Sequence, residues 1–172
     1  MSIIVTGGAG FIGTNFILDW FKKSNEEIIN IDLLTYSGNI KNLKHLNNNK
    51  NFTFLQCDIN NKDLIKKTFL NYKPRAIINF AAESHVDKSI ISSESFIHTN
   101  ILGVHNLLEI SREYWENLSS NKRELFRFYH ISTDEVYGDL KPDSLPFNEE
   151  NTYLPSSPYS ASKAASDHLV RV

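Results

Sequence analysis

The stretch "TGGAGFIGTN" (Thr6–Asn15) decides the fold that we predict for this chain. It follows a short β-rich run, Ser2–Thr6, and leads into apolar residues at helical spacing. Gly7, Gly10 and Gly13 recur every three positions, and the stretch also contains the G-x-G-x-x-G pattern. Such glycines allow a tight turn, close approach of the backbone to a pyrophosphate, and close packing of the helix on the strand. A glycine-rich turn between a strand and a helix therefore predicts a dinucleotide-binding βαβ unit.

Beyond this turn, segments with strand and helix character alternate along the chain. We expect further strands at 27–31, 51–57, 75–82 and 125–132, and further helices at 63–72, at 93–117 and from 159 onward. Alternating elements predict a parallel sheet that is covered by helices on both faces. The expected fold class is therefore α/β, a Rossmann-like doubly wound parallel sheet with five strands. The Pro- and acid-rich segment 139–158 is expected to be a loop.

The length and composition of the chain limit the classes of protein to which it can belong. A chain of 172 residues predicts one compact domain, and 41% hydrophobic with 22% charged residues is ordinary for a globular protein. The net charge is −2 and there is no long basic block, so nucleic acid and anionic membranes are not expected partners. The single cysteine, Cys57, excludes an internal disulfide framework and fits a reducing compartment. No apolar run approaches the roughly 20 residues of a membrane span, and we expect a soluble cytoplasmic protein.

Asp32 ends the second predicted strand, 32 − 13 = 19 residues past the last glycine. A carboxylate at this position accepts hydrogen bonds from an adenosine ribose, and its charge repels a 2′-phosphate. The pattern therefore predicts NAD rather than NADP. In the same architecture Asp58 and Ile59 would lie near the adenine, although Asp58 also fits an ordinary turn. The segment Phe80–Ser84 closes the fourth strand at the carboxyl edge, where ligands of open α/β sheets gather.

Tyr159 and Lys163, in "YSASK", stand four residues apart on one helical face. A phenol with a pKa near 10 is a poor base at neutral pH. An ammonium one turn away, together with the positive charge of a nicotinamide, favours the phenolate and lowers that pKa. Alone, the pair often arises by chance. Together with the glycine turn and Asp32 it predicts hydride-transfer chemistry with Tyr159 as the base.

Asp134 and Glu135 form an adjacent acid pair, which only Thr133 separates from the predicted strand that ends at Ser132. Neighbouring like charges repel, so the pair is more readily explained by chemistry than by stability. Two adjacent carboxyl groups can act as one acid and one base only where their environments separate their pKa values. A solvated acidic turn is the alternative interpretation.

At this point the chain resembles a known family. The Tyr-x-x-x-Lys motif after TGxxGxxG is the pattern of the extended short-chain dehydrogenases/reductases. Within that superfamily the segments "TGGAGFIGTNF", "DLLTYSGN", "AAESHVD", "HISTDEVYGDL" and "PSSPYSASKAASDHLVR" are similar to dTDP-glucose 4,6-dehydratases. The resemblance runs from Ile3 to Arg171. Its most specific part is Thr133-Asp134-Glu135, because the related 4-epimerases lack the acid pair.

The resemblance implies a reaction and a set of site residues. It implies oxidation at C4 by NAD with Tyr159 and Lys163, removal of the C5 proton by Glu135, protonation of the leaving C6 hydroxyl by Asp134, and return of the hydride to C6. Ser84 and Thr133 are expected to contact the sugar. Cofactor contacts are expected from Gly7, Gly10, Phe11, Ile12, Gly13, Asp32, Leu33, Leu34, Thr35, Asp58, Ile59, Phe80, Ala81, Ala82, Ser84, Thr99, Tyr159 and Lys163. No metal site is expected.

Family members are roughly twice as long as this chain. We therefore interpret residues 1–172 as the NAD-binding, catalytic part, without the C-terminal substrate domain that selects the nucleotide base. Two alternatives stay open: a dehydratase for UDP-glucose or a related sugar nucleotide, and a catalytically silent NAD-binding fragment or partner subunit. The resemblance also implies a homodimer formed through the helices at 93–117 and 159–172.

Overall fold

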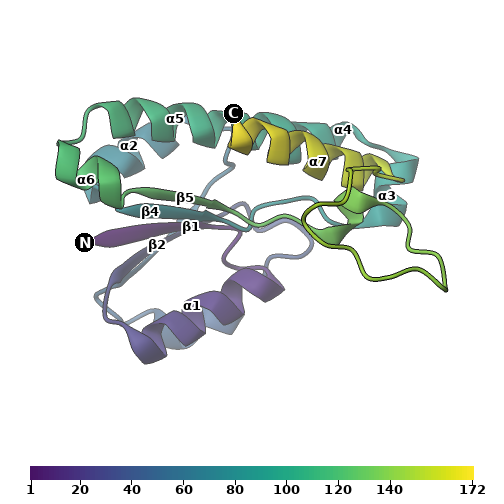
Figure 1. The fold of residues 1–172 in the computed structure, drawn as a ribbon. Coiled ribbons are helices and arrows are strands. Elements are labelled where there is room, and N and C mark those ends of the chain that lie inside the picture. The colour runs from purple at the N-terminus through teal and green to yellow at the C-terminus, as the bar shows by residue number, and fades with distance from the viewer. The chain divides into compact units, whose positions relative to one another are not determined.

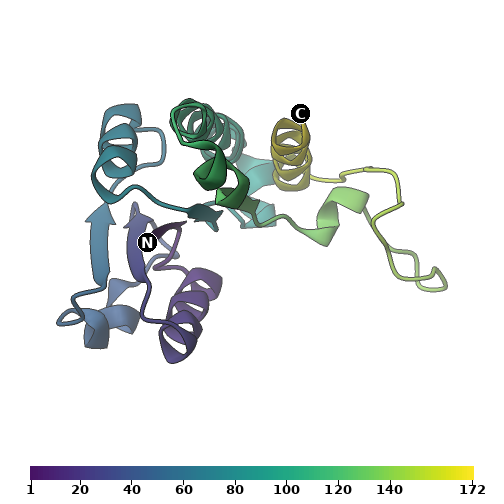
Figure 2. The same ribbon diagram turned by 60° about the vertical axis from the view of Figure 1, so that its left-hand side comes forward.

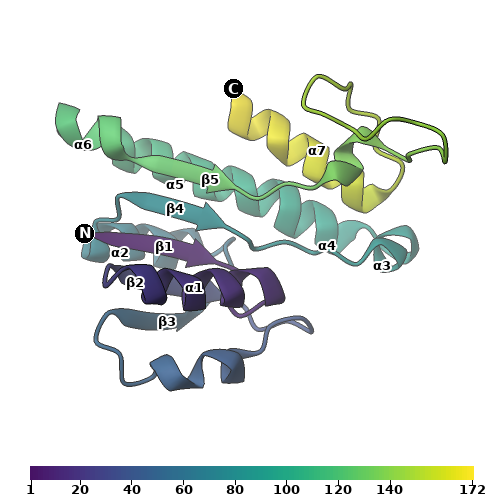
Figure 3. The same cartoon turned by 60° about the horizontal axis from the view of Figure 1, so that its bottom comes forward.

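A five-stranded parallel sheet organises the computed structural model, which describes all 172 residues. The strand order is β3-β2-β1-β4-β5 (Figures 1 and 3). The strands are β1 (Ser2–Thr6), β2 (Glu27–Asp32), β3 (Phe52–Gln56), β4 (Ala76–Asn79) and β5 (Arg127–His130). The predicted α/β class and the five parallel strands are confirmed. β4 and β5 are shorter than expected, so the segments 80–82 and 131–132 lie beyond the ends of their strands.

Helices connect these strands. They are α1 (Phe11–Lys23), the 3-10 helix η1 (Ile40–Leu46), α2 (Lys62–Tyr72), α3 (Val86–Ile91), α4 (Glu94–Phe96), the π-helix η2 (Ile97–Gly103), α5 (Val104–Glu116), α6 (Ser120–Leu125), the 3-10 helix η3 (Asp134–Tyr137) and α7 (Pro158–Arg171). The single long helix predicted at 93–117 is wrong in detail, because η2 interrupts it. Sequence reasoning also missed α3 and α6, which are six residues each and too short for a clear 3.6-residue periodicity.

The chain folds into two compact units. Unit 1 comprises residues 1–81 and 106–131 and contains the whole sheet. Unit 2 comprises residues 82–105 and 132–172 and contains α3, α4, η2, η3 and α7. The glycine turn belongs to unit 1, while the acid pair and the Tyr-x-x-x-Lys motif belong to unit 2.

Unit 1 has one hydrophobic core on each face of its sheet. Figure 2 shows α1 and η1 on one side of the strands and α2 and α5 on the other. β1 is buried along its full length, and its successive side chains enter the two cores in turn. Ile3 and Val5 pack in the core that contains Ile17 of α1, whereas Ile4 packs with Leu107 of α5. This burial on both faces explains why β1 reads as an unbroken apolar run.

The turn after β1 leaves no room for side chains at two of its glycines. Gly7 has φ +69°, in the left-handed region, and its N–H donates to the carbonyl of Ile31 at 2.8 Å. A Cβ on Gly7 would lie 2.5 Å from the backbone nitrogen of Ala81, just past β4. A Cβ on Gly13 would lie 2.5 Å from the Gly7 carbonyl oxygen. The turn is therefore held against the end of β4 on one side and against the first turn of α1 on the other.

We expect Gly7→Ala to lower the free energy of unfolding by roughly 2–4 kcal/mol, because a left-handed φ and a backbone clash add together. Gly10→Ala is the matched control. Gly10 has φ −74°, and its added Cβ would meet nothing closer than 3.3 Å. Urea denaturation of both variants measures the difference. Equal stability of Gly7→Ala and the wild type would contradict this account of the turn.

Candidate active site

Asp32 holds the glycine turn in place from the end of β2. Its Oδ2 accepts a hydrogen bond from the Ala9 N–H at 2.9 Å, and its Oδ1 accepts one from the Leu34 N–H at 2.8 Å. The residue is 9% exposed. An ionised carboxylate has about four acceptor sites, so two remain for a ribose hydroxyl. The sequence predicted only the ligand-binding role of Asp32, and its structural role was missed.

The N-terminus of α1 fits a pyrophosphate. Gly10 is the N-cap and has no side chain with which to bind the free N–H groups of the first turn. That turn carries no acidic residue, so nothing neutralises the positive end of the helix dipole. The close contacts at Gly7 and Gly13 keep the turn bare of side chains. These features are the ones that a dinucleotide phosphate requires at a helix N-terminus.

Other predicted cofactor residues of unit 1 lie along the carboxyl edge of the sheet. Leu33 is exposed after β2, Leu34 has a left-handed φ of 59°, and the carbonyl of Thr35 accepts from Gly38 N–H at 3.1 Å. Asp58 Oδ1 accepts from the backbone and side-chain nitrogens of Asn60, at 2.8 and 3.1 Å, which is an ordinary turn. The Ile59 side chain lies in the core, so only its backbone is open to a ligand.

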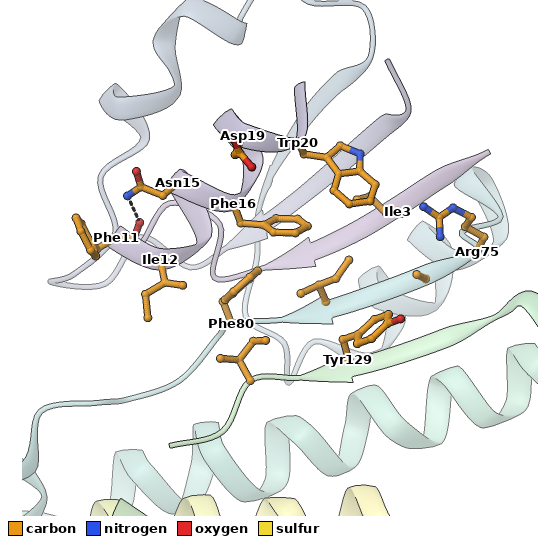
Figure 4. Close-up of a pocket in the computed structure, with 13 residues that line it drawn as sticks. Ile3, Phe11, Ile12, Asn15, Phe16, Asp19, Trp20, Arg75, Phe80 and Tyr129 are labelled. Carbon is orange, nitrogen blue, oxygen red and sulfur yellow. Dashed lines mark hydrogen bonds between the residues drawn. The ribbon is translucent and has the colours of Figure 1, made fainter. Parts of the chain in front are cut away.

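The side chains of Phe11, Ile12 and Phe80 line an apolar groove beside β5 (Figure 4), and their predicted contacts with the cofactor stay a prediction. The groove has a volume of about 740 Å³ and is bordered by residues of α1, β1, β4 and β5. β5 pairs only with β4, so it is an edge strand of the sheet. Tyr129 and Ile131 on this edge are 53% and 37% exposed. Apolar side chains along the edge strand of a sheet typically mark a surface that another element covers.

In unit 2 the acid pair occupies the short helix η3. Thr133 is its N-cap, and the Thr133 Oγ1 accepts from the Glu135 N–H at 3.3 Å. Asp134 and Glu135 are both exposed. Partial desolvation of the Glu135 carboxyl group, followed by the charges of Asp134 and Asp139, raises the pKa of Glu135 above its ordinary value. A carboxylate with a raised pKa is a stronger base when it is ionised.

Tyr159 lies in the first turn of α7, where sequence and structure agree closely. Pro158 is the first helical residue, and Ser157 and Ser160 form a capping box. Tyr159 is 8% exposed, and its ring packs edge-to-face on Phe96 with centroids 6.4 Å apart. Burial raises the pKa of Tyr159, a hydrogen bond with Thr133 opposes that shift, and the charges of the acid pair add to it. The structure therefore brings Thr133, the acid pair and Tyr159 into mutual electrostatic reach.

Lys163 lies one turn further along α7 and is 3% exposed. Burial lowers the pKa of its ammonium to about 8, while the charge of Asp167 acts in the opposite direction. A lysine is buried at this depth only where a specific environment holds it. Its burial and its lowered pKa distinguish Lys163 from a surface lysine.

Asn100, which sequence reasoning missed, organises the predicted residues of the 82–99 region. Its Oδ1 accepts from the Glu83 N–H, and its Nδ2 donates to the Glu83 carbonyl and to Ser162 Oγ, each at 2.9 Å. It thereby joins the segment of Ala82 and Ser84 to α7. Ser84 is exposed and Thr99 is half-buried on η2. No local feature of the segment "TNILG" marks Asn100, because its burial and its partners arise only in the fold.

No group of three or more His, Cys, Asp and Glu side chains is placed to hold a metal ion. None of the helices is long and apolar enough to cross a membrane.

The buried Lys163 makes stability depend on pH. Between pH 8 and the ordinary lysine pKa of 10.5, the unfolded chain binds more protons than the folded one, so stability rises with pH. We expect the wild type to gain roughly 2 kcal/mol relative to Lys163→Met between about pH 8 and about pH 10. Urea denaturation across this range measures the gain, and Lys141→Met, in the exposed loop, is the control. A pH-independent difference between wild type and Lys163→Met would show that the ammonium is not destabilised by burial.

Comparisons with known proteins identify the family to which the chain belongs. The model of the GDP-mannose 4,6 dehydratase family matches residues 4–172. A dTDP-glucose 4,6-dehydratase from Neisseria gonorrhoeae is 50% identical over 170 residues, which cover 99% of this chain and 49% of that protein. The chain thus spans about half the length of the curated relatives that it matches.

Solved structures of dTDP-glucose 4,6-dehydratases also match the fold of this chain. A dTDP-glucose 4,6-dehydratase from Streptomyces venezuelae, solved with NAD bound, superposes with a TM-score of 0.87 at 38% identity over 99% of this chain and 51% of that chain. One from Bacillus anthracis, also in complex with NAD, gives a TM-score of 0.84 at 38% identity over 98% of this chain and 49% of that chain. With a Rossmann-like sheet, a bare glycine turn and an acid pair near a Tyr-x-x-x-Lys motif, the chain belongs to the GDP-mannose 4,6-dehydratase family.

Proposed function

We propose that residues 1–172 form the cofactor-binding and catalytic half of an NAD-dependent dTDP-glucose 4,6-dehydratase. The observation that carries the proposal is the group formed by Thr133, Asp134, Glu135 and Tyr159 in unit 2, with Lys163 one turn away on α7. An epimerase needs only a hydride removed and returned at C4. A 4,6-dehydratase must also eliminate water, and this step needs an acid and a base. The relatives that are about 50% identical carry this activity in their names.

NAD is the cofactor that the residues of unit 1 fit. The first turn of α1 offers N–H groups to a pyrophosphate, and Asp32 offers acceptor sites to a ribose while repelling a 2′-phosphate. Held by these residues, NAD would supply the hydride acceptor for oxidation at C4 of the sugar and the hydride donor for reduction at C6.

Tyr159 is the base for the oxidation at C4. Its phenolate takes the proton of the C4 hydroxyl. In the chain itself, burial and the neighbouring carboxylates raise the pKa of Tyr159, so the Lys163 ammonium and the bound cofactor must supply the opposing positive charge. Thr133, which hydrogen-bonds the phenol of Tyr159, is proposed to hydrogen-bond the sugar hydroxyl as well. The low pKa of Lys163 also lets its ammonium pass a proton on at neutral pH.

The acid pair performs the elimination. A ketone at C4 acidifies the C5 proton, and Glu135 removes it as a base whose pKa is raised. Asp134 protonates the departing C6 hydroxyl, which leaves as water. The C5 carbon is reprotonated once C6 has been reduced. Both carboxyl groups are exposed on η3, so a sugar can reach them without a rearrangement of the helix.

We propose that the polypeptide that relatives carry beyond the matched segment adds to the edge of β5 and covers the apolar groove. The unpaired edge and the exposed Tyr129 and Ile131 support this location. A homodimer through the η2–α5 and α7 helices belongs to the same proposal, and the exposed Ile97 and Leu102 of η2 favour it. The free, buried Cys57 fits a cytoplasmic location.

The reaction is tested by mass spectrometry of dTDP-glucose after incubation with the chain and NAD. We expect the product to have lost one water, and Glu135→Gln to slow this loss by about 10²–10⁴-fold, as is typical for removal of a general base. Glu149→Gln, an exposed acid of the neighbouring loop, is the control and should keep the full rate. A parallel incubation with UDP-glucose tests which nucleotide base the substrate carries.

Loss of water that persists in Glu135→Gln would refute the assigned role of Glu135. A folded chain that binds NAD in a titration but releases no water would refute activity of these 172 residues alone. Adding the separately expressed second half of the Neisseria gonorrhoeae relative then tests whether that half supplies what is missing.

The docking surface is tested by light scattering with the same second half. We expect a complex with the wild-type chain, and at least about tenfold weaker association of Ile131→Lys, because a charge in an apolar contact costs more than 1.4 kcal/mol. Leu145→Lys is the control, since Leu145 is 88% exposed and lies outside the groove. Equal association of the two variants would exclude the β5 edge. The scattering of the chain alone reports whether it dimerises.

A further inference from the structure

A buried carboxylate outside the predicted site connects three segments of unit 2. Asp167 lies on α7 and is 7% exposed. Its Oδ2 accepts one hydrogen bond from Ser132 Oγ at 2.5 Å and another from the Tyr153 hydroxyl at 3.1 Å. Ser132 immediately precedes the acid-pair segment, and Tyr153 belongs to the loop between η3 and α7. Both segments thus donate a hydrogen bond to the same oxygen, Oδ2 of Asp167.

Tyr153 extends this connection through an aromatic cluster. Its ring meets Tyr137 edge-to-face with centroids 5.2 Å apart, and it lies 5.4 Å from the ring of His168 on α7. Tyr137, the last residue of η3, also packs against Phe147 at 5.5 Å. The far end of η3 and the loop are therefore packed around the same tyrosine whose hydroxyl reaches Asp167. The two ends of η3 are both tied, directly or through Tyr153, to one side chain of α7.

We propose that Asp167 is a positioning residue, which fixes the segment of Thr133, Asp134 and Glu135 relative to Tyr159 and Lys163 by holding Ser132 and Tyr153 against α7. The catalytic meaning of this role rests on the proposed function, but the contacts themselves do not. Asp167 also lies one turn after Lys163 on the same helix, so its charge acts on the buried ammonium. Loss of the carboxylate therefore has an electrostatic consequence that the loss of a purely structural contact does not have.

Several other charged and titratable groups surround this region. Tyr153 lies in the loop, and Tyr159, His168 and Arg171 lie on α7. The elements packed against α7 carry Asp87 and Lys88 (α3), Glu94 (α4), His98 (η2), and Asp134 and Glu135 (η3). Comparison of single variants of Asp167 leaves all of these groups in place. A change in the titration of Lys163 between Asp167→Asn and the wild type then reports the carboxylate itself.

The test uses the 172-residue chain and no activity measurement, so its failure and failure of the proposed function are distinguishable. Lysine side-chain NMR, with the Lys163 signal assigned through Lys163→Met, gives the pKa of Lys163. Hydrogen–deuterium exchange of the backbone amides measures how readily the segments 133–137 and 139–157 open locally. We expect Asp167→Asn to lower the pKa of Lys163 and to speed exchange in both segments by at least about fivefold, the equivalent of one lost hydrogen bond.

Two milder variants separate charge from contact. Tyr153→Phe and Ser132→Ala each remove one donor and keep the carboxylate. We expect faster exchange in 139–157 for the first and in 133–137 for the second, with the pKa of Lys163 closer to that of the wild type than in Asp167→Asn. Asp167→Glu, which keeps the negative charge, should bring the pKa of Lys163 close to its wild-type value. An unchanged pKa of Lys163 in Asp167→Asn, or unchanged exchange in Ser132→Ala and Tyr153→Phe, would overturn the proposal, and the second outcome decides even if Asp167→Asn fails to fold.

Discussion

The close contact between the turn after β1 and the end of β4 is the constraint on which the architecture of unit 1 depends. Gly7 adopts a left-handed φ and lies where any side chain would overlap the backbone at Ala81. Because Gly13 lies equally close to the Gly7 carbonyl, the same contact fixes where α1 begins. Asp32 then fastens the turn to β2 through the Ala9 N–H. The turn thus contacts the carboxyl ends of β1, β2 and β4, and it fixes the position of the N-terminus of α1 next to them.

Much of this arrangement is predictable because it is local. The glycine spacing, the apolar run of β1 and the Tyr-x-x-x-Lys spacing each encode their structure within about a dozen residues, and all three predictions agree with the structure. The helix that begins at Pro158 is a strong case, because the sequence supplies the N-cap serine and the proline at the first position.

What escaped prediction depends on partners that are distant in sequence. Asn100 bonds to Ser162, and Ser132 bonds to Asp167, across separations of 62 and 35 residues. No periodicity reports such pairs, because they exist only once the fold has brought the elements together. The π-helix η2, which contains Asn100, was also missed, because the apolar spacing of a segment does not distinguish an i→i+5 pattern from an ordinary helix. The apolar groove lined by Phe11, Ile12 and Phe80 was also missed, because it is formed by elements that lie far apart in the sequence.

The two hydrogen bonds of Asp32 have a consequence for the evolution and redesign of such proteins. A change of cofactor preference toward a phosphorylated ribose normally begins by removing this negative charge. Here the same carboxylate accepts the N–H groups of Ala9 and Leu34, so its removal would leave two backbone donors without their partner. Selectivity and folding are therefore coupled at one side chain. A lineage could exchange its cofactor only after other residues had taken over the support of the turn, which makes this position resistant to single-step change.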